Sequence, residues 1–117
     1  MRMPAFATSV LLTLIASTAA NAHAFLDHAE PRVGSTVPTS PSELSLFYTQ
    51  NLESAFSAVE VSDANGKRVD LGKSSISANV MRVGLKQLTP GTYRVRWRVL
   101  SVDTHTTEGS FTFHVGQ

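Results

Sequence analysis

The chain has 117 residues, no cysteine, and ten basic against nine acidic side chains, for a formal net charge of +1. This length suffices for one domain with a single core. The near balance of charge excludes a basic field of the kind that binds nucleic acid, and the absence of cysteine excludes disulfides, thiolate metal sites and cysteine nucleophiles.

Residues 1–22 are predicted to be a secretory signal and not part of the folded domain. Arg2 gives a weakly basic start, and residues 5–16 are apolar but too few to span a bilayer. Ala20-Asn21-Ala22 then fits a small-x-small cleavage site. We therefore expect export of the chain and cleavage after Ala22.

The mature chain, residues 23–117, is predicted to be one soluble domain that begins with His23. No apolar run after residue 22 approaches the roughly 20 residues that a membrane helix needs. We therefore expect no membrane insertion of the mature chain.

Short apolar stretches that alternate with turn residues predict an all-β domain. Residues 44–49 and 59–62 alternate between two faces with the period of a strand. The Asp63-Ala64-Asn65-Gly66 segment predicts a tight connection, because Asn and Gly adopt positive φ at low cost. A hairpin into residues 68–71 is expected to follow.

Three further strands are predicted in the second half of the chain. One covers residues 79–85, before the Thr89-Pro90-Gly91 turn, and another covers residues 111–115. The clearest pattern is at residues 93–99, where apolar side chains at odd positions, including Tyr93 and Trp97, are expected in the core, and three arginines alternate with them on a solvated face. Six or seven short strands predict a two-sheet antiparallel sandwich.

Four histidines follow the predicted cleavage site, and His23 is the one that cleavage makes terminal. A terminal histidine offers an α-amino nitrogen and an imidazole to one metal ion, a chelate that suits the tetragonal environment of Cu(II). The alternative is an arbitrary residue at a frayed terminus. We expect His28 to face solvent or make a local hydrogen bond, and His114 to be an exposed strand residue.

The Asp103-Thr104-His105 motif supplies two further candidate ligands. In an extended segment residues two apart point the same way, so Asp103 and His105 would converge beyond the end of the 93–99 strand. With His23 they would place three nitrogens and one oxygen around Cu(II). The alternative is a polar loop in which Asp103 makes an Asx-type turn. Met81 is the one methionine after residue 22, which argues against a thioether-rich Cu(I) site.

Sequence motifs over nearly the whole mature chain are typical of one family. They are His23-Ala24-Phe25-Leu26, Glu30-Pro31-Arg32-Val33-Gly34-Ser35, Phe47-Tyr48-Thr49-Gln50-Asn51-Leu52, Gly91-Thr92-Tyr93, the stretch from Trp97 to His105, and Gly109-Ser110-Phe111-Thr112-Phe113. With them the chain resembles the CopC family of periplasmic copper-resistance proteins.

The resemblance implies an immunoglobulin-like Greek-key sandwich of about seven antiparallel strands. It implies a periplasmic protein, not an enzyme, that holds one Cu(II) through His23, Asp103 and His105 and acts in copper resistance, buffering or transport. Gln50 stands where some members carry a Glu near the site, and a neutral amide does not replace that charge. Whether His28, Gln50 or water completes the site is left open.

The resemblance also suggests partners. Some relatives fuse this domain to a membrane protein of the CopD kind, whereas this chain stops at Gln117. The expected partner is therefore a separate CopD-like inner-membrane protein or another periplasmic copper protein.

Two other functions fit the same residues. Lytic polysaccharide monooxygenases also hold copper on a β-sandwich through an N-terminal and a second histidine, so a copper-dependent oxidative enzyme is the main alternative. Asp103 as a direct ligand argues against it, because it would occupy coordination space and favour the oxidised ion. A metal-free sandwich used for protein contact is the third possibility.

Overall fold

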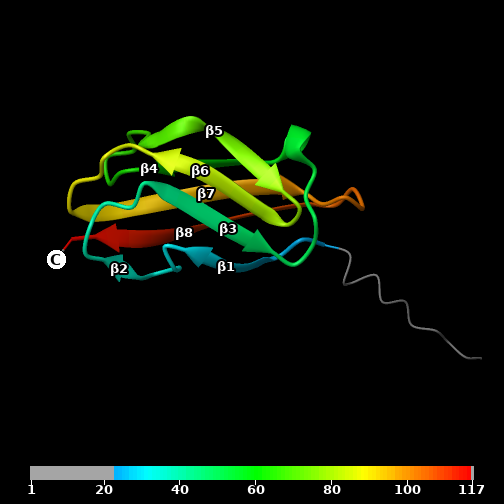
Figure 1. Cartoon of the computed structure of the whole chain (residues 1–117), viewed down its shortest axis with the longest axis horizontal. Coiled ribbons are helices and arrows are strands. Elements are labelled where there is room, and N and C mark those ends of the chain that lie inside the picture. Colours follow the sequence, from blue (N-terminus) through cyan, green and yellow to red (C-terminus); the bar gives the residue numbers. More distant parts are fainter. Residues whose placement is uncertain (1–22, 117) are drawn as a thin grey trace, which may run out of the picture.

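Two four-stranded sheets form the domain, which the computed structural model describes for residues 23–116 (Figure 1). The predicted signal segment, residues 1–22, lies outside the described residues. The first sheet has the order β1-β3-β6-β5, with β1 at Leu26–Glu30, β3 at Glu43–Tyr48, β6 at Val80–Leu85 and β5 at Asp70–Ser77. The second has the order β2-β8-β7-β4, with β2 at Thr36–Val37, β8 at Thr106–Val115, β7 at Gly91–Leu100 and β4 at Ala58–Ser62. A short 3₁₀ turn, η2 (Ser54–Phe56), lies between β3 and β4.

The strand order is that of an immunoglobulin-like sandwich. Leaving out the two-residue β2, the first, second, fifth and fourth strands form one sheet, and the third, sixth and seventh form the other. The predicted sandwich class is therefore confirmed. The prediction of a purely antiparallel fold needs one correction, because β2 pairs with β8 in parallel.

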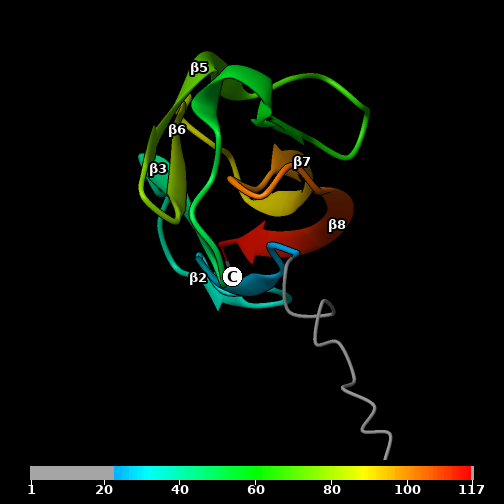
Figure 2. The ribbon, with the colours of Figure 1, turned by 90° about the vertical axis from the view of Figure 1, so that its right-hand side faces the viewer.

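The core lies between the two sheets and is filled from alternating strand positions (Figure 2). On β7, Tyr93, Val95 and Val99 are buried, and the three arginines between them are exposed, as the alternation predicts. Trp97 differs from the expectation of full burial, since it is half-buried and packs edge-on against Tyr48 with ring centroids 5.2 Å apart. The Tyr48 hydroxyl is buried without a hydrogen-bond partner among residues 23–116, and burial raises its pKa above the usual range.

The turn predicted at residues 63–66 is present. The Asp63 carboxylate accepts the backbone N–H groups of Asn65 and Lys67, both at 2.9 Å, and Gly66 adopts a φ of 86°. The expected hairpin into residues 68–71, however, ends soon after a single bridge between Ser62 and Arg68. The chain then crosses to the other sheet, where β5 pairs with β6.

Asp70 is the reason that the hairpin ends. Its buried carboxylate accepts the backbone N–H of Val61 at 2.8 Å, so a side chain takes the place of a ladder partner, and it also accepts two hydrogen bonds from Arg68 and one from Gly72. Burial alone raises the pKa of Asp70, but these donors together lower the pKa below its usual value. The Asp70 carboxylate is therefore anionic and links β5 of one sheet to β4 of the other.

The long β7–β8 hairpin determines where the chain's candidate ligands lie. The two strands pair in register from Gly91 with Val115 to Leu100 with Thr106, so the 101–105 connection projects from one end of the sandwich. β1 starts at the same end (Figure 1). Among residues 23–116, no helix is both long and apolar enough to cross a membrane.

Candidate metal centre

The three predicted ligands come from two segments that are distant in sequence and adjacent in the fold. Residues 23–25 precede β1, and residues 101–105 connect β7 to β8. The His23 and His105 rings stack with centroids 4.5 Å apart and an interplanar angle of 20°. Asp103 Oδ1 lies 3.3 Å from His105 Nδ1.

Ser101 organises the 101–105 connection from a fully buried position. Its backbone N–H donates to the His105 carbonyl at 2.9 Å, and its carbonyl accepts the Thr104 N–H at 2.8 Å. Its hydroxyl donates to the Asp103 carboxylate and accepts the His105 N–H at 3.3 Å. The segment is therefore a tight turn that the buried Ser101 stabilises, and Thr104 adopts a positive φ of 72° within it.

Asp103 and His105 are close, as predicted, but for a different structural reason. Residues 101–105 form a turn and not the extended segment that the sequence predicts. The side chains nevertheless face each other, and the Asp103 carboxylate also interacts with the His105 backbone N–H, as the Asx-type alternative expected. The hydrogen bond from Ser101, with further help from His105, lowers the pKa of Asp103 below its usual value and so favours an anionic oxygen donor.

Two threonine hydroxyls hold the residues after His23 in place. Thr107, at the start of β8, donates to the Ala24 carbonyl at 2.7 Å. Thr49, just after β3, accepts the Phe25 N–H at 2.9 Å, and its own N–H donates to the Phe25 carbonyl at 2.9 Å. These contacts keep His23 beside His105. Sequence reasoning missed both threonines, because a hydroxyl that bonds a distant backbone leaves no local pattern.

The stacked rings do not form a finished metal site. Among residues 23–116, no group of three or more His, Asp or Glu side chains is arranged to hold a metal ion. Imidazole lone pairs lie in the ring plane, so the nitrogens of two nearly parallel rings do not point at a common ion. His105 is exposed and His23 is half-buried, so both rings have room to rotate.

The remaining histidines have other contacts. His28 lies on β1, where its ring stacks on Phe47 with centroids 4.2 Å apart and its Nδ1 lies 2.7 Å from Asp27 Oδ2, as expected of a local hydrogen bond. His114 Nδ1 lies 3.0 Å from Thr92 Oγ1 on the neighbouring strand. His114 is half-buried, which corrects the expectation that it is exposed.

Comparison with known proteins identifies the family. A family model described as "CopC domain" matches residues 26–116. Protein YobA of Escherichia coli (strain K12) is 32% identical over 114 residues, covering 94% of this chain and 92% of that protein. Copper resistance protein C of Pseudomonas syringae pv. tomato is 30% identical over 119 residues, covering 94% of each chain.

A solved structure agrees with these sequence matches. The crystal structure of CopC from Methylosinus trichosporium OB3b superposes with a TM-score of 0.76 and 31% identity, covering 80% of this chain and 94% of that one. The family match, the relatives and the shared sandwich lead to one conclusion. The chain belongs to the CopC family.

Proposed function

We propose that this chain is a periplasmic copper-binding protein that holds one Cu(II) and acts in copper resistance, buffering or transport. The ligands are the α-amino group and imidazole of His23, the carboxylate of Asp103 and the imidazole of His105. The observation that carries the proposal is the contact between the His23 and His105 rings, 4.5 Å apart, with Asp103 Oδ1 at 3.3 Å from His105. A relative named copper resistance protein C supports the choice of metal.

The donor set fits Cu(II) chemically. Imidazole and amine nitrogens with one carboxylate oxygen suit a tetragonal divalent copper ion, and the anionic Asp103 offsets part of its charge. Soft ligands for Cu(I) are scarce, because Met81 is the single methionine after residue 22 and is fully buried in the core. The proposed ion is therefore Cu(II).

Export completes the proposed site. In the full sequence the nitrogen of His23 is a peptide amide that follows Ala22, and an amide nitrogen binds a metal ion only after it loses a proton that it holds far more tightly than an ammonium group does. Cleavage after Ala22 turns it into an amine beside the imidazole of the same residue. Binding of one ion by both residues would require the stacked rings of His23 and His105 to rotate so that their nitrogens converge.

The proposed role is that of a carrier, not of an oxidative enzyme. The relatives named copper resistance proteins favour resistance, and the proposed ligand Asp103 stabilises the oxidised ion. A carrier requires a partner that gives or accepts copper, and we propose a CopD-like inner-membrane protein or another periplasmic copper protein in that role.

Calorimetric titration of the processed protein with Cu(II) tests this function. We expect His105→Ala to weaken binding by at least about 100-fold, since loss of an outer-shell partner alone costs 10- to 100-fold in many metal sites. His114→Ala is the matched control, because His114 bonds Thr92 away from the centre, and it should bind as the parent does. Equal copper affinity in the two variants would refute the assignment.

A further inference from the structure

Three exposed apolar side chains lie at the end of the sandwich that carries the candidate metal centre. We call this the site end and define it as the connections 23–25, 49–57, 78–79 and 101–105, which lie together at one end of the strands (Figures 1 and 2). Among the described residues five large hydrophobic side chains are exposed: Phe25, Val33, Phe56, Leu71 and Val102. Three of them, Phe25, Phe56 and Val102, belong to the site end, with exposures of 53%, 72% and 50%.

Backbone hydrogen bonds fix the main chain at two of these residues. Phe25 is paired with Thr49 in both directions, and its ring stacks on His23 with centroids 5.9 Å apart. The Val102 N–H donates to the Asn51 carbonyl at 3.1 Å. A residue whose main chain is already fixed loses little backbone entropy when a partner covers it, so both residues favour binding.

Phe56 lies beside an apolar groove. It belongs to η2, which Ser57 fixes to β7, because the Ser57 hydroxyl accepts the Leu100 N–H at 3.0 Å. Phe56 and Leu100 line a groove of about 570 Å³, and polar side chains of Ser57, Arg98 and Thr106 line it as well. Thr106 follows His105 directly, so the groove opens next to the candidate metal centre.

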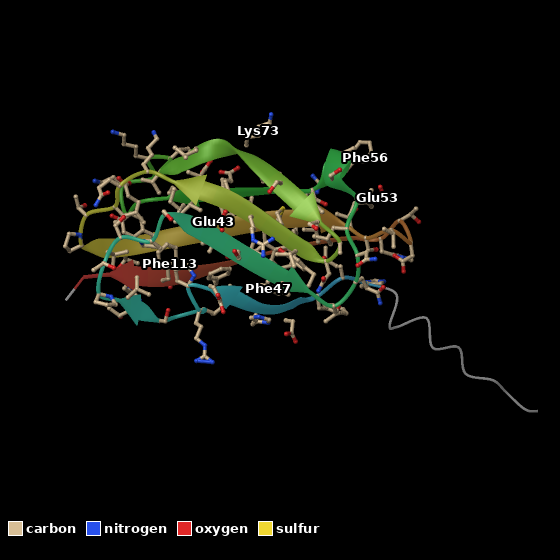
Figure 3. The ribbon with its side chains drawn as sticks, viewed as in Figure 1. Glu43, Phe47, Glu53, Phe56, Lys73 and Phe113 are labelled. Carbon is tan, nitrogen blue, oxygen red and sulfur yellow. The ribbon has the colours of Figure 1, made fainter. Side chains whose placement is uncertain are left out.

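The two ends of the molecule differ in charge. The site-end connections contain Glu53 and Asp103 and no lysine or arginine. The connections at the opposite end, residues 31–35, 38–42, 63–69 and 86–90, contain four bases and one acid: Arg32, Lys67, Arg68, Lys86 and Asp63. Figure 3 shows Glu53 and Phe56 at the site end. The metal-free chain is thus nearly neutral overall but polarised, and its more acidic end is the end with the exposed apolar side chains. A bound Cu(II) would offset the charge of Asp103 and leave Glu53 as the acid of that end.

We propose that the site end docks a partner protein whose surface has an apolar anchor surrounded by basic side chains, and that copper passes through this contact. An apolar centre with a polar rim is the usual anatomy of a protein interface, and complementary charge raises the rate of encounter. The copper step rests on the proposed function, whereas the docking surface rests on Phe25, Phe56, Val102 and the charge of the end. A second copy is a poorer occupant, because its basic end exposes Val33 and no aromatic anchor.

Docking is tested without copper. The ¹⁵N-labelled processed protein is titrated with two synthetic amphipathic helices, one of lysine and leucine and one of glutamate and leucine, and amide shifts are mapped by NMR. We expect the lysine peptide to shift amides in 23–25, 49–57 and 101–106, and the glutamate peptide to bind at least about tenfold more weakly. Equal binding of the two peptides, or shifts confined to other surfaces, would overturn the proposal.

Matched variants locate the contact. Phe56→Ser and Glu53→Lys should each weaken binding of the lysine peptide severalfold, and neither should unfold the domain, because both side chains are exposed. Val33→Ser and Glu30→Lys make the same kinds of change outside the site end and should bind as the parent does. If sedimentation of the metal-free protein revealed self-association that Glu53→Lys abolishes, the end would belong to a second copy and the proposal would be wrong.

Copper transfer separates this inference from the proposed function. Each peptide is given a Gly-Gly-His head as copper acceptor, and the rate of copper loss from the loaded protein is measured. We expect the lysine tail to accept copper faster than the glutamate tail at low salt, because Glu53 remains negative in the loaded protein, and the advantage to shrink as salt screens the charges. A protein that binds no copper but still docks the lysine peptide would refute the function alone. Normal copper binding with equal transfer to both tails would refute the passage of copper through this contact.

Discussion

The imidazole ring of His23 stacks on that of His105, with centroids 4.5 Å apart, although the two residues lie far apart in the sequence. His105 lies in the connection of the β7–β8 hairpin, and the hydroxyls of Thr49 and Thr107 hold the segment that follows His23. The closeness of the rings is therefore a property of the sandwich.

The Thr107 hydroxyl should matter for copper more than for folding. Thr107→Val keeps the shape of the side chain and removes the hydrogen bond to the Ala24 carbonyl. We expect Cu(II) affinity to fall about tenfold, as for loss of an outer-shell contact, and the free energy of unfolding to fall by about 1 kcal/mol. Calorimetry and urea unfolding measure the two effects. Thr112→Val, at an exposed position on the same strand, is the control. An equal loss of affinity there would show that the hydrogen bond from Thr107 to Ala24 does not position His23 for copper.

Asp70 should stabilise the fold in a pH-dependent way. Asp70→Asn removes the charge that receives hydrogen bonds from Val61, Arg68 and Gly72, and we expect a loss of about 2–3 kcal/mol at pH 7. Because folding lowers the pKa of Asp70, its contribution is complete above the unfolded pKa of about 3.9 and is lost as the pH falls through the folded value.

Urea unfolding of the parent and of Asp70→Asn between pH 7 and pH 2 checks this sign. The difference in stability between the two should shrink as the pH drops below about 4. Glu108→Gln, at an exposed position on β8, should change stability by less than about 0.5 kcal/mol at every pH. A stability gap at pH 2 as large as that at pH 7 would exclude the charge of Asp70 as its cause.

Residue 109 should have to be glycine, because the Trp97 ring leaves no room for a side chain there. The two residues are paired across β7 and β8, and a Cβ on Gly109 would lie 2.6 Å from Trp97 Cζ2. Gly109→Ala must therefore displace the indole, and we expect a loss of about 1–3 kcal/mol with a shifted fluorescence maximum. Gly91→Ala is the control, since its nearest neighbour would be 3.9 Å away. Adding Trp97→Phe to Gly109→Ala should recover part of the loss, and no recovery would argue against the steric cause.

The strands with strong alternation could be predicted from the sequence. On β7, apolar and arginine residues alternate from Tyr93 to Val99, and the structure buries the odd positions apart from half-buried Trp97. β1 and β2 could not be predicted in this way, because β1 buries a single side chain, Ala29, and β2 has two residues. Their positions follow from pairing with β3 and β8, which no local pattern records.

The candidate metal centre also has parts that could be predicted from the sequence and parts that could not. Asp103 and His105 are close in sequence, so their proximity could be predicted, although the turn that joins them depends on buried Ser101. The crossover at Asp70 and the hydrogen bonds from Thr49 and Thr107 could not, because each joins a side chain to a backbone group on another segment. Such contacts are decided by the tertiary fold and not by local propensity.

The most direct test of the account compares two forms of the chain, one that begins at His23 and one that retains Ala22. Mass spectrometry fixes each N-terminus, and electron paramagnetic resonance of the Cu(II) forms reports the nitrogen and oxygen donors. The form that begins at His23 should show three nitrogens and one oxygen and bind at least about 100-fold more tightly than the form with Ala22. Identical spectra and affinities for the two forms would contradict the terminal chelate.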